Sequence, residues 1–353
     1  MNNLRILRAR IAFPLLGTLA FFIISLSACE PSVSVAPNLI VAIDEAFAEM
    51  RPGLSKALEA PPLRAKGERR IDISLVLGPA LVVERLAALP PEKKPTTIVV
   101  SPLLARILLA NALRSADSTQ GAAAPRNDQE PNAARIEGAR LVALEWAGPI
   151  PGSLSTVRSD YRAAYSRAGT AAGSYIAALR AIDAPGATGG IIFLESPSRT
   201  RDLVDAFSSA YASALGGEAL VKFLPLGPSG ESPTNADAEY AVKSLLESDL
   251  RILFIAAGPA SPAAFRAATG PGRAIGIEAS EGGDLKKAAD FFIGPDDKAL
   301  VAALSELALI SDVKKINIDV PARLEASKSA KTLSVGGKTL TDYLESAAQK
   351  NMP

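Results

Sequence analysis

The sequence predicts an α/β fold in which parallel sheets are flanked by helices. Short β-rich runs recur along the chain, and most of them are apolar throughout. Between most of these runs, apolar residues fall at spacings of three and four, as they do on one face of a helix. Apolar strands that alternate with helices are typical of parallel sheets covered on both faces.

Nine strands and two long helices are the clearest elements of this pattern. One helix is predicted at 159–182 and the other at 198–215. The second has Ser196 as a candidate N-cap and Gly216 at its end, where a left-handed stop is needed. The predicted strands are 39–43, 71–77, 96–100, 140–145, 190–194, 219–224, 251–257, 274–278 and 290–294.

Two stretches depart from the alternation of strands and helices. Residues 115–138 are polar and rich in proline and glycine, which predicts a long exposed loop. The tail around 334–340, "SVGGKTL", predicts a β-hairpin followed by a final helix.

The N-terminus has the pattern of a signal peptide. Three arginines precede an uncharged stretch, Ile11 to Ala28, whose 18 residues are marginal for a membrane span. The residues Leu26 to Cys29 resemble the bacterial lipobox, in which an aliphatic residue and two small residues precede a cysteine. The resemblance implies that Cys29, the only cysteine, becomes the lipidated first residue of the mature protein. An ordinary secretory signal and a helical membrane anchor are the alternatives.

The composition excludes several classes of functional site. The absence of histidine excludes Ser-His-Asp and Cys-His catalytic pairs and every histidine-bearing zinc site. Removing residues 1–28 with their three arginines changes the formal charge from +1 to about −2, so no basic face for nucleic acid is expected. Asp296 and Asp297 precede a helical pattern and are interpreted as helix capping rather than metal ligands. We expect no enzyme activity, no cofactor and no metal.

The order of these elements resembles the type I periplasmic binding protein family, which includes sugar receptors, lactose-repressor-like ligand domains and basic membrane protein lipoproteins. The likeness covers roughly residues 38–350, and its motifs lie in the predicted helix at 159–182 and in the strand and helix after it. The motif that the nucleoside-binding branch carries after its first strand is represented here only by Asp44 and Phe47. The matching residues are Asp160, Ala168, Gly169, Ala172, Leu179, Ile191 to Leu194, Phe207 and Tyr211.

The resemblance implies two lobes, each a parallel sheet flanked by helices, joined by three hinge crossovers near 158, 290 and 315. The expected organisation is a lipoprotein signal peptide at 1–28, a tether at 29–37, lobe 1 at 38–158 plus 290–315, and lobe 2 at 159–289 plus 316–353.

Open α/β sheets bind ligands beyond the carboxyl ends of their strands, which makes the polar and glycine residues at those ends candidates for ligand contact. Several also have a structural interpretation: Trp146 could be buried at a lobe edge, Asp44 could be favoured at a helix start by the macrodipole, Ser101 and Ser196 could cap helices, and Arg199 could be solvated. The ligand-binding candidates are Asp44, Gly78, Ser101, Trp146, Asp160, Glu195, Ser196, Arg199, Gly258, Glu278 and Ser280.

The expected function is that of a lipid-anchored extracytoplasmic solute-binding protein in the cell envelope, facing the periplasm or the exterior. It would capture a sugar, nucleoside or amino acid between its lobes and deliver it to an ABC-type permease. We expect a monomer, held to the lipid bilayer through the acylated Cys29. The main alternative is an envelope lipoprotein that uses the same fold as a docking module for cell-wall enzymes, which the low aromatic content of 5% favours slightly. A carboxylate-based hydrolase is the third hypothesis.

Overall fold

The computed structural model describes residues 39–59, 71–77, 81, 84, 97–119, 135–136, 139–146, 154–182, 184–195, 201–227, 231–279, 284–307 and 316–350. The proposed signal peptide, the tether and Cys29 lie outside these ranges. So do four of the ligand-binding candidates, Gly78, Ser196, Arg199 and Ser280. Among the described helices, none combines the length and apolar character that spanning a bilayer requires.

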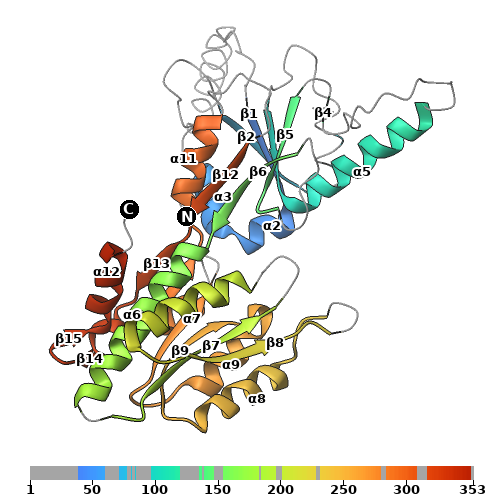
Figure 1. The fold of residues 1–353 in the computed structure, drawn as a ribbon. Coiled ribbons are helices and arrows are strands. Elements are labelled where there is room, and N and C mark those ends of the chain that lie inside the picture. Colours follow the sequence, from blue (N-terminus) through green and yellow to red (C-terminus); the bar gives the residue numbers. More distant parts are fainter. Residues whose placement is uncertain are drawn as a thin grey trace, which may run out of the picture. The chain divides into compact units, whose positions relative to one another are not determined.

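The first sheet has the order β12-β6-β5-β3-β1-β2, with all of these strands parallel (Figure 1). A short strand, β4 (Arg135–Ile136), pairs antiparallel with β5. The bounds are β1 Leu39–Asp44, β2 Ile71–Leu77, β3 Thr97–Val100, β5 Ala139–Leu144, β6 Ser155–Asp160 and β12 Asn317–Pro321.

The second sheet has the order β13-β11-β10-β9-β7-β8, in which only β13 runs antiparallel to its neighbour. A separate two-stranded hairpin, β14 (Ser334–Val335) with β15 (Lys338–Thr339), precedes the last helix. The bounds are β7 Thr188–Leu194, β8 Leu220–Leu224, β9 Leu250–Ala256, β10 Ala274–Glu278, β11 Phe291–Gly294 and β13 Arg323–Ala326.

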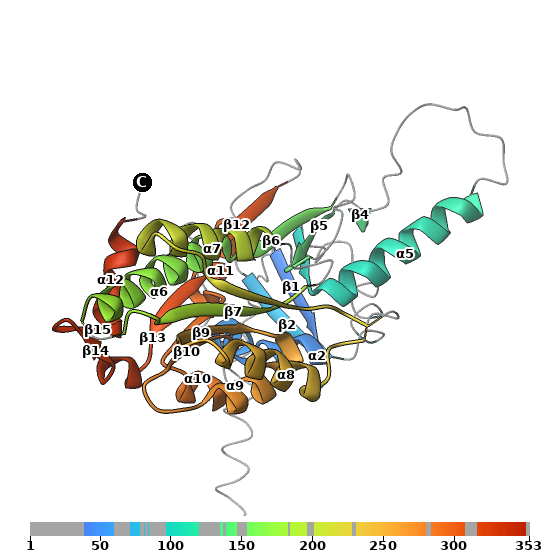
Figure 2. The same ribbon diagram turned by 60° about the horizontal axis from the view of Figure 1, so that its bottom comes forward.

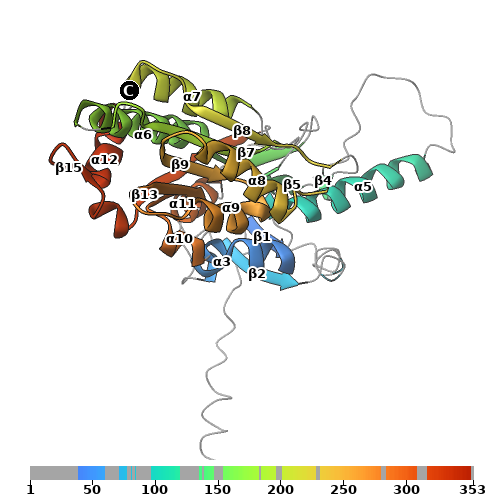
Figure 3. The ribbon, with the colours of Figure 1, turned by 90° about the horizontal axis from the view of Figure 1, so that it is seen from below.

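Helices cover both faces of each sheet. In the second sheet, α6 and α7 lie on one face and α8 and α9 on the other (Figure 2), and α12 packs beside α6 (Figure 3). The helices associated with the first sheet are α2 Glu45–Met50, α3 Pro52–Glu59, α5 Pro102–Thr119 and α11 Asp297–Leu307. Those associated with the second are α6 Arg162–Ile182, α7 Asp202–Leu215, α8 Asn235–Leu246, α9 Ser261–Ala268, α10 Asp284–Ala288 and α12 Leu340–Lys350.

The core follows from the alternation of side chains along each strand. In β1, Val41 and Ile43 pack with α2, α3 and α11, whereas Ile40 and Ala42 pack with α5 on the opposite face. The second sheet repeats the arrangement, since Phe254 of β9 joins the cluster under α6 and α7, and its neighbour Ile255 joins the cluster under α8 and α9. The central strands of each sheet are therefore buried on both faces, which explains why they are predominantly apolar, whereas β6, β12 and β13 are more polar.

Glycines bring α6 and α7 unusually close together. A Cβ atom at Gly169 would lie 2.1 Å from the carbonyl oxygen of Phe207, and one at Gly173 would lie 2.5 Å from that of Tyr211. Only glycine fits at such a backbone approach. Phe207 and Tyr211 are consequently buried against the sheet.

The apolar runs predict the strands well, and the C-terminal hairpin and final helix are also confirmed. Gly216 ends α7 with a φ of 77°, as its position after the helical pattern predicts. Two expectations are wrong: residues 159–160 end strand β6 instead of starting the helix, and residues 115–119 are the last turn of α5 instead of a loop. The rest of the expected loop, at 120–134, lies outside the described residues.

The chain passes between the two sheets at three places in the described ranges, but not at the expected residues. It leaves the first sheet after β6, at Asp160, and returns between β11 and α11, near Pro295. It leaves again between β12 and β13, at Ala322. The boundaries expected at 290 and 315 are too early because β11 pairs within the second sheet and β12 pairs with β6 in the first.

Candidate functional site

The carboxyl ends of the parallel strands place a set of polar side chains along one edge of each sheet. Because neighbouring strands run in the same direction, their last residues meet at the same edge, where open α/β sheets bind ligands. In the first sheet these residues include Asp44 at the end of β1, Ser101 after β3 and Glu145 after β5. In the second they include Glu195 after β7 and Glu278 at the end of β10.

Asp44 and Ser101 form a buried pair. The Ser101 hydroxyl donates to the Asp44 carboxylate, and the Asp44 N–H donates to Ser101 Oγ at 3.4 Å. Asp44 also caps α2 by accepting the N–H of Phe47 at 3.0 Å. Asp44 therefore has a structural role at the start of α2, where an acid is favoured, and its pair with Ser101 connects the ends of β1 and β3.

A second, largely buried cluster of side chains in this lobe is ionic. Arg51 Nη1 contacts Glu145 Oε1 at 2.8 Å, and its Nη2 contacts Asp297 at the start of α11. Glu145 in turn accepts the N–H of Ser159 at 2.9 Å and the Ser159 hydroxyl. Arg51 is only 7% exposed and Asp297 only 2%. The cluster thus joins residues beside the first and second crossings between the sheets.

Two features indicate that the surrounding structure fixes the geometry of this cluster. Burial alone would lower the pKa of Arg51, but the Glu145 and Asp297 carboxylates outweigh it and hold the pKa above its ordinary value. Glu145 has a φ of 45°, the only positive φ of a non-glycine residue in the described part of the chain. Such a backbone persists where the surroundings over-determine it, and it often occurs at functional sites.

In the second sheet, Glu195 pairs with Arg201 at the start of α7. Arg201 Nε and Nη2 donate to the two carboxylate oxygens at 2.7 and 3.1 Å. The Arg201 guanidinium also lies over the ring of Phe223, with Cζ 4.9 Å from the ring centroid. The hydrogen bond from Arg201 lowers the pKa of Glu195, so that this exposed carboxylate is ionised at neutral pH.

Glu278 is the last residue of β10, and Gly258 lies shortly after the end of the neighbouring strand β9. The buried Tyr165 of α6 donates its hydroxyl to Glu278, which links the helix to the end of β10. Gly258 has a φ of 58° and opens a short 3-10 helix, Gly258–Ala260, directly after β9. A side chain at this position would be strained and would meet Leu194, so glycine is required here.

Trp146 and Asp160 occupy the remaining described candidate positions. Trp146 is half-buried, packs against the cluster under α5 and has Arg106 Cζ 5.7 Å from its ring centroid. The exposed Asp160 accepts the N–H of Arg162 at 3.0 Å, at the start of α6. It is the last residue of β6, at the first crossing between the sheets.

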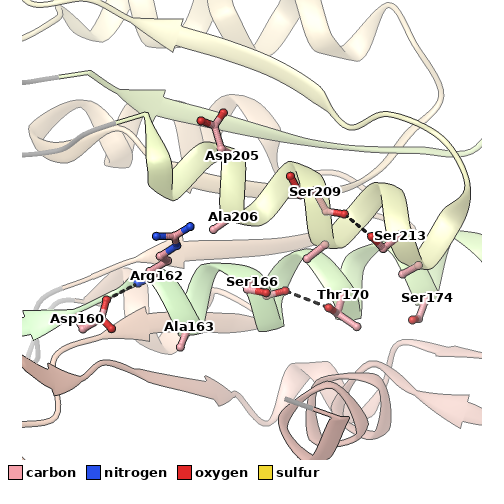
Figure 4. Close-up of a pocket in the computed structure, with 12 residues that line it drawn as sticks. Asp160, Arg162, Ala163, Ser166, Thr170, Ser174, Asp205, Ala206, Ser209 and Ser213 are labelled. Carbon is pink, nitrogen blue, oxygen red and sulfur yellow. Dashed lines mark hydrogen bonds between the residues drawn. The ribbon is translucent and has the colours of Figure 1, made fainter. Parts of the chain in front are cut away.

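A shallow groove of about 910 Å³ runs along the outer surface of α6 and α7 (Figure 4). Serine, threonine and alanine side chains line most of it, with Asp160, Arg162 and Asp205 toward one end. The hydroxyls of Thr170 and Ser213 donate to carbonyl oxygens one turn earlier in their own helices, at 3.1 and 2.8 Å. These two hydroxyl groups already donate hydrogen bonds within their own helices. The groove therefore does not bring a cluster of reactive side chains together.

The sequence alone did not identify Arg51, Glu145 and Asp297 as one cluster. The predicted capping role at Asp296-Asp297 is confirmed for Asp296, whose Oδ1 accepts the N–H of Ala299 at 3.0 Å. Asp297 instead pairs with Arg51, which is 246 positions away. Within the described ranges, no group of three or more carboxylate, histidine or cysteine side chains is arranged to hold a metal ion.

No protein-family model matches the sequence, and neither does any curated protein. Solved structures do match. The chain is similar to a periplasmic ribose ABC transporter from Conexibacter woesei DSM 14684, with a TM-score of 0.54 and 14% identity over 84% of this chain and 94% of that one. It is also similar to a transcriptional activator of the comK gene from Bacillus halodurans, with a TM-score of 0.53 and 11% identity over 88% and 95%. A third match is an ABC transporter system solute-binding protein from Aeropyrum pernix K1, with a TM-score of 0.50 and 12% identity over 89% and 86%.

These matches extend over most of both chains in each case. Together with the two parallel sheets, they show that the chain has the type I periplasmic-binding-protein fold. Identities this low establish the fold alone, and both solute receptors and transcriptional regulators use it.

Proposed function

We propose that the chain is an extracytoplasmic solute-binding protein that captures a small polar molecule between its two lobes and hands it to an ABC-type permease. The observation that carries the proposal is that both sheets present polar side chains at the carboxyl ends of their strands. In this fold, two such edges connected by a hinge bind one ligand from both sides, and binding closes the lobes.

The buried cluster around Arg51 supports a hinge mechanism. It ties Ser159, directly before the first crossing, to Asp297, directly after the second. The third crossing lies beside the first, because the N–H of Ala322 donates to the carbonyl oxygen of Asp160 at 2.8 Å. We expect these contacts to hold the three connections together, so that the second lobe can move as a unit.

The lipobox-like residues before Cys29 support an envelope location, with the acylated cysteine as the membrane anchor. The function requires no catalysis, so no substrate is expected to be transformed. A broad thermal-shift screen of sugars, nucleosides and amino acids tests the proposal. At least one solute should stabilise the protein in proportion to its concentration, as expected when ligand binds only the folded state.

A second function, a docking module for envelope enzymes, is favoured by the groove along α6 and α7. Small side chains line it, and such surfaces let a partner backbone approach closely. The two functions are distinguished by comparing the solute screen with capture of membrane enzymes by the immobilised protein. A docking module would retain an enzyme and would respond to no solute.

A further inference from the structure

On the side of the first lobe, a buried cluster fixes the chain at two of the three crossings. Arg51 contacts Asp297, the first residue of α11, and through Glu145 it is linked to Ser159 beside the first crossing. Arg51 and Asp297 are buried, and all four residues belong to the first lobe. A turn of the second lobe therefore leaves these contacts intact.

Asp296, the residue before α11, differs from Asp297 because its side chain contacts both lobes. Its Oδ1 accepts the N–H of Ala299 at 3.0 Å and so caps α11 in the first lobe. Its Oδ2 lies 3.7 Å from Nε of Arg323, which is the first residue of β13 in the second lobe. Asp296 thus lies at the second crossing, and Arg323 lies directly after the third. A turn of one lobe against the other changes the distance between these two side chains.

The Asp296–Arg323 pair has the properties of an adjustable contact. The two side chains are 23% and 30% exposed, so water can replace either partner. Arg323 Nη1 also contacts Glu325 Oε1 at 3.0 Å within β13. When Asp296 moves away, Arg323 keeps an ionic partner and no charge is left both buried and unpaired. Separation of the pair therefore costs little.

The pair between Arg158 and Asp319 provides a contrast close to the same crossings. Arg158 Nε contacts Asp319 Oδ1 at 2.6 Å, and the two residues lie on β6 and β12, which are neighbours in the first sheet. Both strands turn together as parts of one lobe. This pair therefore has no influence on the angle between the lobes.

We propose that Asp296 and Arg323 form an adjustable restraint on the angle between the lobes. Their ion pair favours one angle and separates as the lobes turn about the crossings. A partly exposed ion pair changes an equilibrium about two- to fivefold, which biases the hinge without locking it. The restraint goes beyond solute capture, because it is a property of the hinge and needs no ligand.

Distances between two spin labels, measured by pulsed electron paramagnetic resonance without any ligand, test the restraint. The labels are attached at Glu49→Cys in α2 and Lys243→Cys in α8, two exposed helix positions in different lobes. The parent protein is the full chain with these two changes, purified in detergent. It also carries Cys29→Ser, so that the introduced thiols are the only ones.

Two variants of this parent remove the ion pair from its two sides. Asp296→Asn removes the charge and keeps an oxygen that caps α11, because asparagine and aspartate cap helices about equally well. It should change the ratio of the lobe angles by about two- to fivefold, seen as a shift or a broadening of the distance distribution. Arg323→Gln should change the distribution in the same direction. Asp319→Asn is the matched control, and it should leave the distribution unchanged.

Salt gives a second readout, which a purely structural role of Asp296 would not change. Raising the ionic strength from about 0.1 to about 1 M shortens the screening length from about 10 to about 3 Å. The distribution of the parent protein should then shift in the direction seen with Asp296→Asn. The Asp296→Asn variant itself should show no such shift, because the ion pair is already absent.

A distance distribution that is the same in the parent, Asp296→Asn and Arg323→Gln overturns the restraint. If one of these variants does not fold, the other decides. An equal change in Asp319→Asn also overturns the proposal, because the effect would then belong to surface charge in general. Neither result affects solute capture, which the thermal-shift screen tests separately, and a protein that binds no solute would still show the restraint.

Discussion

Arg51 and Glu145 are 94 positions apart in sequence, and their side chains meet at 2.8 Å in the interior of the first lobe. The guanidinium also contacts Asp297, and both partners lie close to the chain's crossings between the sheets. Because a buried charge that loses its partner remains desolvated, this interaction is expected to matter more for stability than any exposed ion pair.

Replacing Arg51 tests this expectation. Arg51→Met should lower the free energy of unfolding by about 3–5 kcal/mol, since it leaves Glu145 and Asp297 without their cation in a buried place. The control is Arg158→Met. Arg158 Nε contacts Asp319 at 2.6 Å, but both side chains are about half exposed, and such pairs contribute about 1 kcal/mol or less. Urea unfolding measures both, and equal losses in the two variants would contradict the structural role of the cluster.

The close approach of α6 and α7 gives a second prediction. Gly169→Ala places a methyl group against the carbonyl of Phe207, so the helices must separate, which should cost about 1–3 kcal/mol. At Gly217, just beyond α7, the nearest atoms to an added Cβ lie 3.9 Å away. Gly217→Ala should therefore change stability by about 0.5 kcal/mol or less. Thermal unfolding compares the two, and an unchanged Gly169→Ala variant would show that the helices are not packed this closely.

Tyr211 gives a prediction about a buried hydrogen bond. Its hydroxyl accepts the N–H of Gly189 in β7 at 2.8 Å, and both groups are buried. Tyr211→Phe leaves that N–H without a partner and should cost about 1–3 kcal/mol at neutral pH. Tyr240→Phe is the control because the Tyr240 side chain is 75% exposed. Urea unfolding of both variants at neutral pH is the measurement.

The same residue predicts a response to alkaline pH. Burial raises the pKa of Tyr211 above its ordinary value, an effect that the Gly189 hydrogen bond partly offsets. The folded state then holds the proton at a pH where the unfolded chain has released it. The corresponding stability is fully present below the unfolded pKa of about 10 and is lost as pH rises through the folded pKa. Tyr211→Phe should show a shallower loss of stability above pH 10 than the unaltered protein, and an unchanged slope would count against the buried hydroxyl.

The alternation of apolar strands and helices made most of the second sheet predictable. It failed for β6, whose sequence Ser155 to Asp160 is largely polar, because this strand is stabilised by pairing with β12 rather than by an apolar run. The crossings were misplaced because the apolar strand β11 pairs within the second sheet and β12 pairs with β6 in the first. Periodicity reports which residues are buried locally, and it contains no information about the sheet that a short polar strand joins.

Only part of the candidate site could be predicted from the sequence. Positions such as Asp44 and Glu278 follow from the rule that ligands bind at strand ends, and the structure places both at those ends. The Arg51 cluster depends on long-range contacts and on the left-handed backbone of Glu145, which no sequence pattern indicated. The one indication in the sequence is that Glu145 is the residue directly before the candidate Trp146, at the end of a predicted strand.

The anchor is tested by intact-mass measurement of protein extracted from membranes. If Cys29 is the acylated residue, the mature chain should begin there and carry the mass of its lipids. Cys29→Ala should remain unprocessed at this position. Ser27→Thr is a less disruptive comparison, because it keeps a hydroxyl residue two positions before the cysteine and leaves Ala28 and Cys29 unchanged. A free thiol at Cys29 in the mature protein would contradict the proposed anchor.

Capture of a solute between the lobes is tested by solution X-ray scattering with parallel fluorescence of Trp146, the only tryptophan. The full chain is measured alone and with each member of a panel of sugars, nucleosides, amino acids and amines. We expect at least one solute to lower the radius of gyration and to change the Trp146 emission at the same concentration, because one ligand closes both lobes. A protein that neither compacts nor gains thermal stability with any solute, while a membrane enzyme binds it, would contradict solute capture and support the docking function.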